Sequence, residues 1–128
     1  MNQWHRFVRS VTHAWNGIRH VLQTQRNMKI HAVAAVIVLL AAWWLEIPRG
    51  DWMLVVFAIG LVLSLETVNT AIEAVVDLVT PERHPLARIA KDASAGAVLL
   101  AAITSVVIGL CVFGPPLMAK WEAWISRT

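Results

Sequence analysis

The chain has 128 residues, of which 58% are hydrophobic and only 15% are charged. This composition lies outside the range of soluble globular domains, so we expect a single all-α integral membrane domain over residues 1–128. The formal net charge of +3 favours anionic lipid head groups or an anionic substrate as partners. No basic recognition helix is present, and nucleic acid is therefore excluded as a partner.

The first predicted element is an amphipathic helix over residues 3–24. Its large apolar residues fall within an arc of roughly 100° on a helical wheel. They are Trp4, Phe7, Val8, Val11, Trp15, Ile18 and Leu22. A basic helix with aromatic residues on its apolar face commonly lies flat among lipid head groups, which predicts an interfacial helix here. An ordinary amphipathic helix packed on protein would show the same pattern.

Three apolar segments then predict membrane-spanning helices over residues 30–47, 52–79 and 86–113. Each reaches the length of about 18 residues that a bilayer core demands. The last segment gives the strongest signal, because no charged residue occurs between Asp92 and Lys120. Three spans bury little surface alone, so we also expect a homo-oligomer with sites between subunits.

Proline and glycine mark the expected boundaries of these helices. Pro48 and Gly50 predict a tight turn between the first two spans, and Pro85 is expected to begin the third. The run Gly114–Pro116 is expected to end that helix. Residues 117–125 place their apolar side chains on one side, which predicts a short C-terminal interfacial helix.

The distribution of basic residues predicts the orientation. Eight of the 11 Lys and Arg residues lie in the N-terminal segment or in the loop at residues 81–92. Because cytoplasmic loops carry the excess of Lys and Arg, we place both segments in the cytoplasm. The sequence therefore predicts a multi-pass membrane protein with a cytoplasmic N-terminus.

A stripe of polar residues follows one face of the predicted helix over residues 52–79. At roughly 100° per residue, its members project at about 0°, −60°, −20° and +20°. They are Glu66, Asn69, Glu73 and Asp77. A charged group in a membrane span costs about 2.5 kcal/mol or more, so the stripe indicates a functional site. Polar packing, or a position beyond the lipid, is the alternative interpretation.

The spacing of the stripe suits phosphoryl transfer at a membrane surface. Glu66 and Glu73 are separated by about 10 Å along the helix. One carboxylate can then accept a proton from a lipid alcohol while the other holds Mg²⁺ together with phosphate oxygens. Lys91 would supply a positive charge for the phosphates. No Walker A motif is present in the sequence.

Four segments resemble one family of small prokaryotic lipid kinases, the diacylglycerol kinase and undecaprenol kinase family. The segments are ETVNTAIEAVVD (66–77), ARIAKDASAGAVLL (87–100), AWNGIR (14–19) and RNMKIH (26–31). The resemblance implies a homotrimer of three-span subunits with an interfacial N-terminal helix. It also implies that ATP and Mg²⁺ serve to phosphorylate a membrane lipid alcohol, undecaprenol or diacylglycerol, giving the lipid monophosphate and ADP.

The same resemblance assigns roles to particular residues. Glu66 matches the catalytic proton acceptor, which also meets the lipid substrate, and Asn69 matches its supporting amide. The implied nucleotide contacts are Glu73, Lys91, Asp92, Glu82, Arg83, His84 and His13, and the implied lipid contact is Arg6. Glu73 and Gln25 match the metal-binding positions.

Two positions depart from the family pattern. Gln25 stands where many members have an acid, and a neutral amide oxygen is a weaker Mg²⁺ ligand than a carboxylate. His31 stands where an acid occurs in some relatives. Metal binding is therefore expected to depend mainly on Glu73 and the triphosphate.

Two other functions remain open at this stage. A cation- or proton-coupled transporter would use the same intramembrane acids, but transporters usually contain repeated or broken helices, and this chain shows neither. A non-catalytic membrane scaffold would use the acids only to pair with Lys91 and Arg88. The kinase interpretation is favoured over both.

Overall fold

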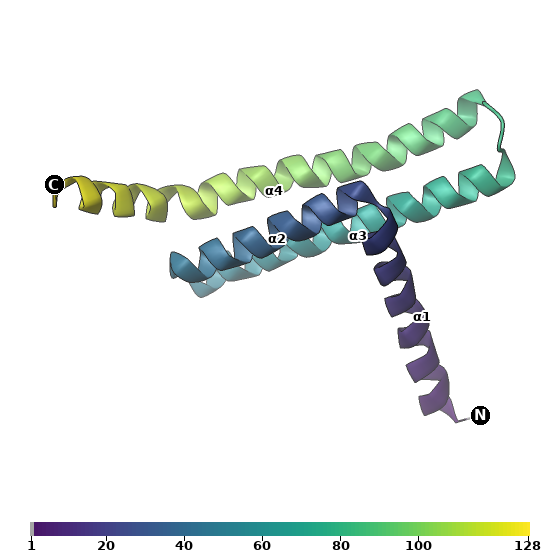
Figure 1. Ribbon diagram of the computed structural model, residues 1–128, viewed down its shortest axis with the longest axis horizontal. Helices are drawn as coiled ribbons and strands as arrows, with labels where there is room; N and C mark the ends of the chain where they lie inside the picture. The colour runs from purple at the N-terminus through teal and green to yellow at the C-terminus, as the bar shows by residue number, and fades with distance from the viewer. Residues whose placement is uncertain (1) are drawn as a thin grey trace.

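The computed structural model describes residues 2–128 as four α-helices, with no strand in this range (Figure 1). The helices are α1 (Gln3–Thr24), α2 (Arg26–Trp44), α3 (Arg49–Val79) and α4 (Pro85–Ile125). Three of them, α2, α3 and α4, are long and apolar enough to cross a membrane. The predicted all-α class with three spanning helices is therefore confirmed, and the chain is a multi-pass membrane protein.

The three spanning helices pack along one another as a bundle, and α3 and α4 form an antiparallel hairpin (Figure 1). A core cluster closes the end of the bundle that lies opposite the α3–α4 loop. It consists of Ala42, Leu45, Ile47, Val55 and Val112. Most large apolar side chains elsewhere on these helices are exposed, as expected of surfaces that face lipid or another subunit.

The turn between α2 and α3 differs from the prediction. The α2 helix ends at Trp44, Glu46 adopts a left-handed conformation with φ of 52°, and α3 begins directly after Pro48. The backbone N–H of Ile47 donates to the carbonyl of Ala42 (3.3 Å), and that of Glu46 donates to the carbonyl of Trp43 (3.2 Å). This is a Schellman motif, in which the left-handed residue ends the helix. The turn is thus made by residues 45–48, and Gly50, expected in it, lies inside α3.

A single extended residue, Gln25, separates α1 from α2. The α2 helix therefore begins at Arg26, four residues earlier than predicted. From this break, α1 leads away from the bundle, and its N-terminal end lies farthest from the spanning helices (Figure 1). The aromatic residues Trp4, Phe7 and Trp15 are exposed on it. Their burial in a lipid interface stays a prediction.

The α4 helix corrects the prediction for the C-terminal region. It does not end at Gly114–Pro116 but runs through both prolines to Ile125, so no separate helix over 117–125 exists. Each proline removes one hydrogen-bond donor, yet neighbouring helices can compensate for this loss in membrane spans. Beyond the prolines α4 still contacts α2, since the Lys120 Nζ lies 4.7 Å from the ring centroid of Trp44.

Candidate functional site

The polar stripe of α3 becomes more exposed toward the α3–α4 loop. Glu66 is 2% exposed and Asn69 is 7% exposed. Two turns further along α3, the side chain of Asp77 is 64% exposed. The stripe therefore leads from the interior of the bundle to its solvent-facing end, and its side chains meet α4.

The middle of the stripe is joined to α4 by a short chain of hydrogen bonds. The Ser94 hydroxyl on α4 donates to Asn69 Oδ1 at 2.7 Å. The Asn69 amide nitrogen in turn donates to Glu73 Oε1 at 3.3 Å. Ser94 and Asn69 are both buried. This chain fixes the side chains of the stripe relative to the second helix.

Glu66 is the most buried acid of the stripe. Its electrostatic neighbours are His31 on α2 and Glu73 on α3. Within residues 2–128, no hydrogen bond reaches its carboxylate. The Thr70 hydroxyl donates to the backbone carbonyl of Glu66 and not to its side chain. Both carboxylate oxygens thus remain available to accept a proton from a hydroxyl group beside the helix.

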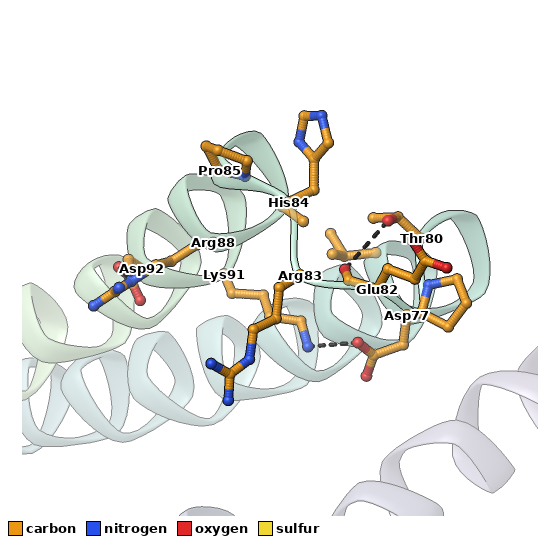
Figure 2. Close-up of a pocket in the computed structure, with 12 residues that line it drawn as sticks. Asp77, Thr80, Glu82, Arg83, His84, Pro85, Arg88, Lys91 and Asp92 are labelled. Carbon is orange, nitrogen blue, oxygen red and sulfur yellow. Dashed lines mark hydrogen bonds and ion pairs between the residues drawn. The ribbon is translucent and has the colours of Figure 1, made fainter.

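A pocket of about 790 Å³ opens where the end of α3, the loop at residues 80–84 and the first turns of α4 meet. Figure 2 shows the residues that line it. Lys91 reaches across to Asp77, with Nζ and Oδ1 2.5 Å apart, and Arg83 lies on the same side as Lys91 (Figure 2). Arg88 pairs with Asp92 one turn along α4, at 3.6 Å. The pocket thus holds three cations (Arg83, Arg88, Lys91) and three acids (Asp77, Glu82, Asp92), and its exposed cations are the groups that a polyanion would bind.

The loop beside the pocket is held in place by hydrogen bonds among its own residues. His84 caps α4, because its Nδ1 accepts a hydrogen bond from the backbone N–H of Leu86 at 3.1 Å. Pro85 occupies the first turn, as predicted, where its missing N–H is not needed. The Thr80 hydroxyl donates to the carbonyl of Glu82 at 3.3 Å. These contacts hold the loop that carries Arg83. Among the described residues there is no strand and no disulfide that could hold it.

The structure brings some predicted site residues together and leaves others apart. The pocket contains Glu82, Arg83, His84, Lys91 and Asp92, and the His84 ring points away from the Lys91 side (Figure 2). Glu73, Asn69 and Glu66 do not line the pocket and precede the lining residue Val76 on α3 by three, seven and ten residues.

Three predicted residues near the N-terminus are not part of this arrangement. Arg6 and His13 are exposed on α1. Gln25 is half-buried, and its amide nitrogen donates to the Thr24 hydroxyl at 3.4 Å. None of the three lines the pocket within the described part of this one chain.

Sequence reasoning missed Ser94 as a site residue, because it lies among the small apolar residues of the segment ARIAKDASAGAVLL. A signal was present in its spacing. Ser94 follows Lys91 by three residues, so both side chains share the face of α4 that meets α3. The ion pair of Lys91 with Asp77 was considered only for the scaffold alternative.

The residues fit a metal ion that is shared with phosphates. Among the described residues, no group of three or more His, Cys, Asp or Glu could hold a metal. Mg²⁺ does not need such a cage, since it is commonly bound by one or two carboxylates together with substrate phosphates. Glu73 offers one carboxylate one turn before the pocket-lining Asp77 and suits this mode of binding.

A helical membrane protein with a buried acid on the helix that leads to a pocket of exposed charged residues has the layout of an enzyme that transfers a group from an anionic donor to a lipid. Comparison with known families agrees. The prokaryotic diacylglycerol kinase family matches residues 12–113 of the chain. This chain belongs to that family.

Individual relatives match most of the chain. It is 47% identical to the undecaprenol kinase of Bacillus subtilis over 116 residues, which cover 91% of this chain and 94% of the relative. It is 44% identical to the diacylglycerol kinase of Synechocystis over 111 residues, which cover 86% and 63%. It is 32% identical to the diacylglycerol kinase of Escherichia coli K12 over 102 residues, which cover 80% and 84%.

The protein is therefore a lipid kinase, an enzyme that phosphorylates a lipid alcohol. Membership of a kinase family implies ATP as the phosphoryl donor and, in general, a divalent metal ion. The comparisons lend no support to the transporter alternative.

Proposed function

We propose that this kinase transfers the γ-phosphoryl group of ATP to the hydroxyl of undecaprenol in the bacterial plasma membrane, giving undecaprenyl phosphate and ADP. The identity of 47% over 94% of an undecaprenol kinase supports this acceptor. Diacylglycerol is the second candidate, supported by the match to the diacylglycerol kinases of Synechocystis and Escherichia coli. The observation that carries the reaction is the position of Glu66, a buried acid on the helix whose end lines the pocket of Arg83, Arg88 and Lys91.

Glu66 is the proposed proton acceptor. A lipid alcohol beside α3 would give its hydroxyl proton to the Glu66 carboxylate while its oxygen bonds to the γ-phosphorus. The bond between the γ-phosphorus and the bridging oxygen breaks, and ADP leaves with the electron pair. The proton on Glu66 then passes to water. Burial of this acid keeps water from competing as the nucleophile.

Lys91 and Arg83 are proposed to hold the triphosphate, with Glu82, His84 and Asp92 as further nucleotide contacts. Lys91 is paired with Asp77 in the structure, but both side chains are well exposed, at 38% and 64%. Exposed ion pairs contribute only about 0–1 kcal/mol. A triphosphate can therefore replace Asp77 as the partner of Lys91 at little cost.

Glu73 is proposed to bind Mg²⁺ together with the phosphate oxygens, and Gln25 is the proposed second position near the metal. When bound, Mg²⁺ would neutralise charge on the phosphoryl oxygens. Asn69 supports Glu73 directly, because its amide donates to Glu73 Oε1 at 3.3 Å. That hydrogen bond leaves the other carboxylate oxygen free.

A homotrimer is proposed as the working unit. Two features support an assembly: the pocket is open, and most apolar side chains of the three spans are exposed in a single chain. Arg6 and His13 lie on α1, away from the pocket, and a neighbouring subunit's α1 could bring these residues to it. The α1 helix is proposed to lie at the cytoplasmic membrane interface, with the N-terminus in the cytoplasm.

The test is to supply the detergent-solubilised protein with Mg²⁺, labelled ATP and either undecaprenol or diacylglycerol. We expect labelled undecaprenyl phosphate. Glu66→Gln should lower kcat by about 10²- to 10⁴-fold with little change in the KM for ATP, since it removes only the proton acceptor. Glu73→Gln should instead raise the Mg²⁺ requirement.

Glu122→Gln is the matched control, because this exposed acid lies near the end of α4 away from the pocket. A folded protein that labels diacylglycerol but not undecaprenol would contradict the proposed acceptor. Full activity of the Glu66→Gln variant would contradict the proposed proton acceptor.

A further inference from the structure

Ser94 is a buried hydroxyl on α4 that faces the polar stripe of α3, and no role has been assigned to it so far. It is 8% exposed. Its hydroxyl lies 2.7 Å from Asn69 Oδ1 and 2.9 Å from the backbone carbonyl of Lys91. A serine inside a helix commonly bonds back to the carbonyl of its own preceding turn. Here the contact to the other helix is the shorter of the two.

The charge of Glu73 determines how the Asn69 amide is turned. Asn69 lies between Ser94 and Glu73, and its amide nitrogen is 3.3 Å from Glu73 Oε1. The reverse orientation would place the amide oxygen against the carboxylate, and two acceptors would then face each other without a hydrogen between them. The nitrogen therefore faces Glu73, the oxygen faces Ser94, and the single Ser94 proton is given to Asn69.

We propose that Ser94 is a positioning residue of this kinase, which acts through Asn69 to fix the Glu73 carboxylate for the metal and the triphosphate. The proposal rests on the proposed function, because it takes Glu73 as the metal-binding acid. Without the Ser94 hydroxyl, the buried Asn69 oxygen has no donor and the amide is free to rotate away. Glu73 would then lose the hydrogen bond to Oε1 that fixes its carboxylate.

Binding of Mn²⁺ together with a non-hydrolysable ATP analogue tests this relation without requiring turnover. Loss of the free Mn²⁺ signal in electron paramagnetic resonance reports the binding. For Ser94→Ala, we expect binding weakened by roughly 10- to 100-fold, the usual effect of removing a group that orients a metal ligand. The half-saturating Mg²⁺ concentration for kinase activity should rise in parallel, while the KM for the lipid stays unchanged.

Two further variants separate positioning from general damage. Ser94→Thr keeps the hydroxyl and should restore most of the binding. Ser105→Ala is the matched control, because Ser105 also lies on α4 against α3, where it approaches the Ala58 carbonyl at 3.5 Å, but about 16 Å from Ser94 along the helix. It should bind like the wild type. The unfolding temperature of each variant in detergent shows whether it is folded.

A double substitution decides whether Ser94 acts through Asn69. In the Asn69→Ala background, the further change Ser94→Ala should weaken Mn²⁺–nucleotide binding by less than about twofold, since its partner is already absent. Effects that multiply would overturn the proposal, as would wild-type binding by a folded Ser94→Ala variant.

The outcomes also separate this inference from the proposed function. A wild type that binds the Mn²⁺–nucleotide but phosphorylates neither lipid would refute the acceptor and leave the Ser94 relation standing. A wild type that phosphorylates lipid while Ser94→Ala behaves identically would refute the Ser94 relation alone. A wild type that binds no Mn²⁺–nucleotide would refute both.

Discussion

Lys91 on α4 and Asp77 on α3 form an ion pair across the pocket, with Nζ and Oδ1 2.5 Å apart. The pair joins the two helices next to the loop that connects them. In this pair Asp77 holds Lys91, the cation that is proposed to bind the triphosphate. Because both side chains are exposed to solvent, the pair is weak and can exchange one anionic partner for another.

Asp77→Asn should therefore release Lys91 and lower the KM for ATP by up to about fivefold, the equivalent of an exposed pair worth at most about 1 kcal/mol. Stability should fall by no more than the same amount. Initial rates at varied ATP concentration provide the measurement. Asp51→Asn removes an equal charge at the opposite end of α3 and should leave the KM for ATP unchanged. A higher KM in the Asp77→Asn variant would show that Asp77 itself contacts the nucleotide or its metal.

Gln25→Glu should strengthen metal binding, because a carboxylate is a better ligand for Mg²⁺ than a neutral amide oxygen. We expect the half-saturating Mg²⁺ concentration to fall by about tenfold. The exposed Gln23 allows a matched control, since Gln23→Glu adds the same charge two residues away on α1. An equal response of both variants would indicate a general effect of negative charge on this surface, and no response of Gln25→Glu would place Gln25 away from the metal.

The sequence identified the stripe of α3 correctly because helical periodicity alone places Glu66, Asn69 and Glu73 on one face. It also located the start of α4, since Pro85 follows a polar loop and suits the first turn of a helix. These features depend on neighbours in sequence. The contact between Asn69 and Ser94 cannot be predicted from neighbours in sequence, because Ser94 lies 25 residues away. The two side chains meet only when α3 and α4 pack together.

The prolines of α4 show a different limit of sequence-based reasoning. Pro115 and Pro116 end helices in water, where the freed carbonyl groups are readily solvated, so a break was predicted there. The helix instead continues to Ile125. In a spanning helix, ending the hydrogen-bonded ladder exposes more backbone groups than two prolines do, and continuation is favoured. Local propensity could not show which of these costs is larger.

Glu46→Gly should stabilise the protein. Glu46 has φ of 52°, a left-handed conformation that costs an L-residue about 1–2 kcal/mol and costs glycine nothing. Glycine also gives the unfolded chain more freedom, so the expected net gain is about 1 kcal/mol. Denaturation in detergent measures it, and kinase activity should not change. Glu122→Gly places the same substitution inside α4 and should destabilise by about 1 kcal/mol. Destabilisation by Glu46→Gly would mean that the Glu46 side chain makes a compensating contact.

The N-terminus and the α3–α4 loop should face the cytoplasm, because two spans separate them and eight of the 11 basic residues lie on their side. Single cysteines at the two ends of the chain test this, in a Cys111→Ala background that removes the native thiol. In intact cells, a membrane-impermeant maleimide should label Thr128→Cys. It should label Gln3→Cys only after the cells are permeabilised. The reverse pattern would turn Glu73 and Lys91 away from the cell's ATP, and the proposed reaction could not then draw on it.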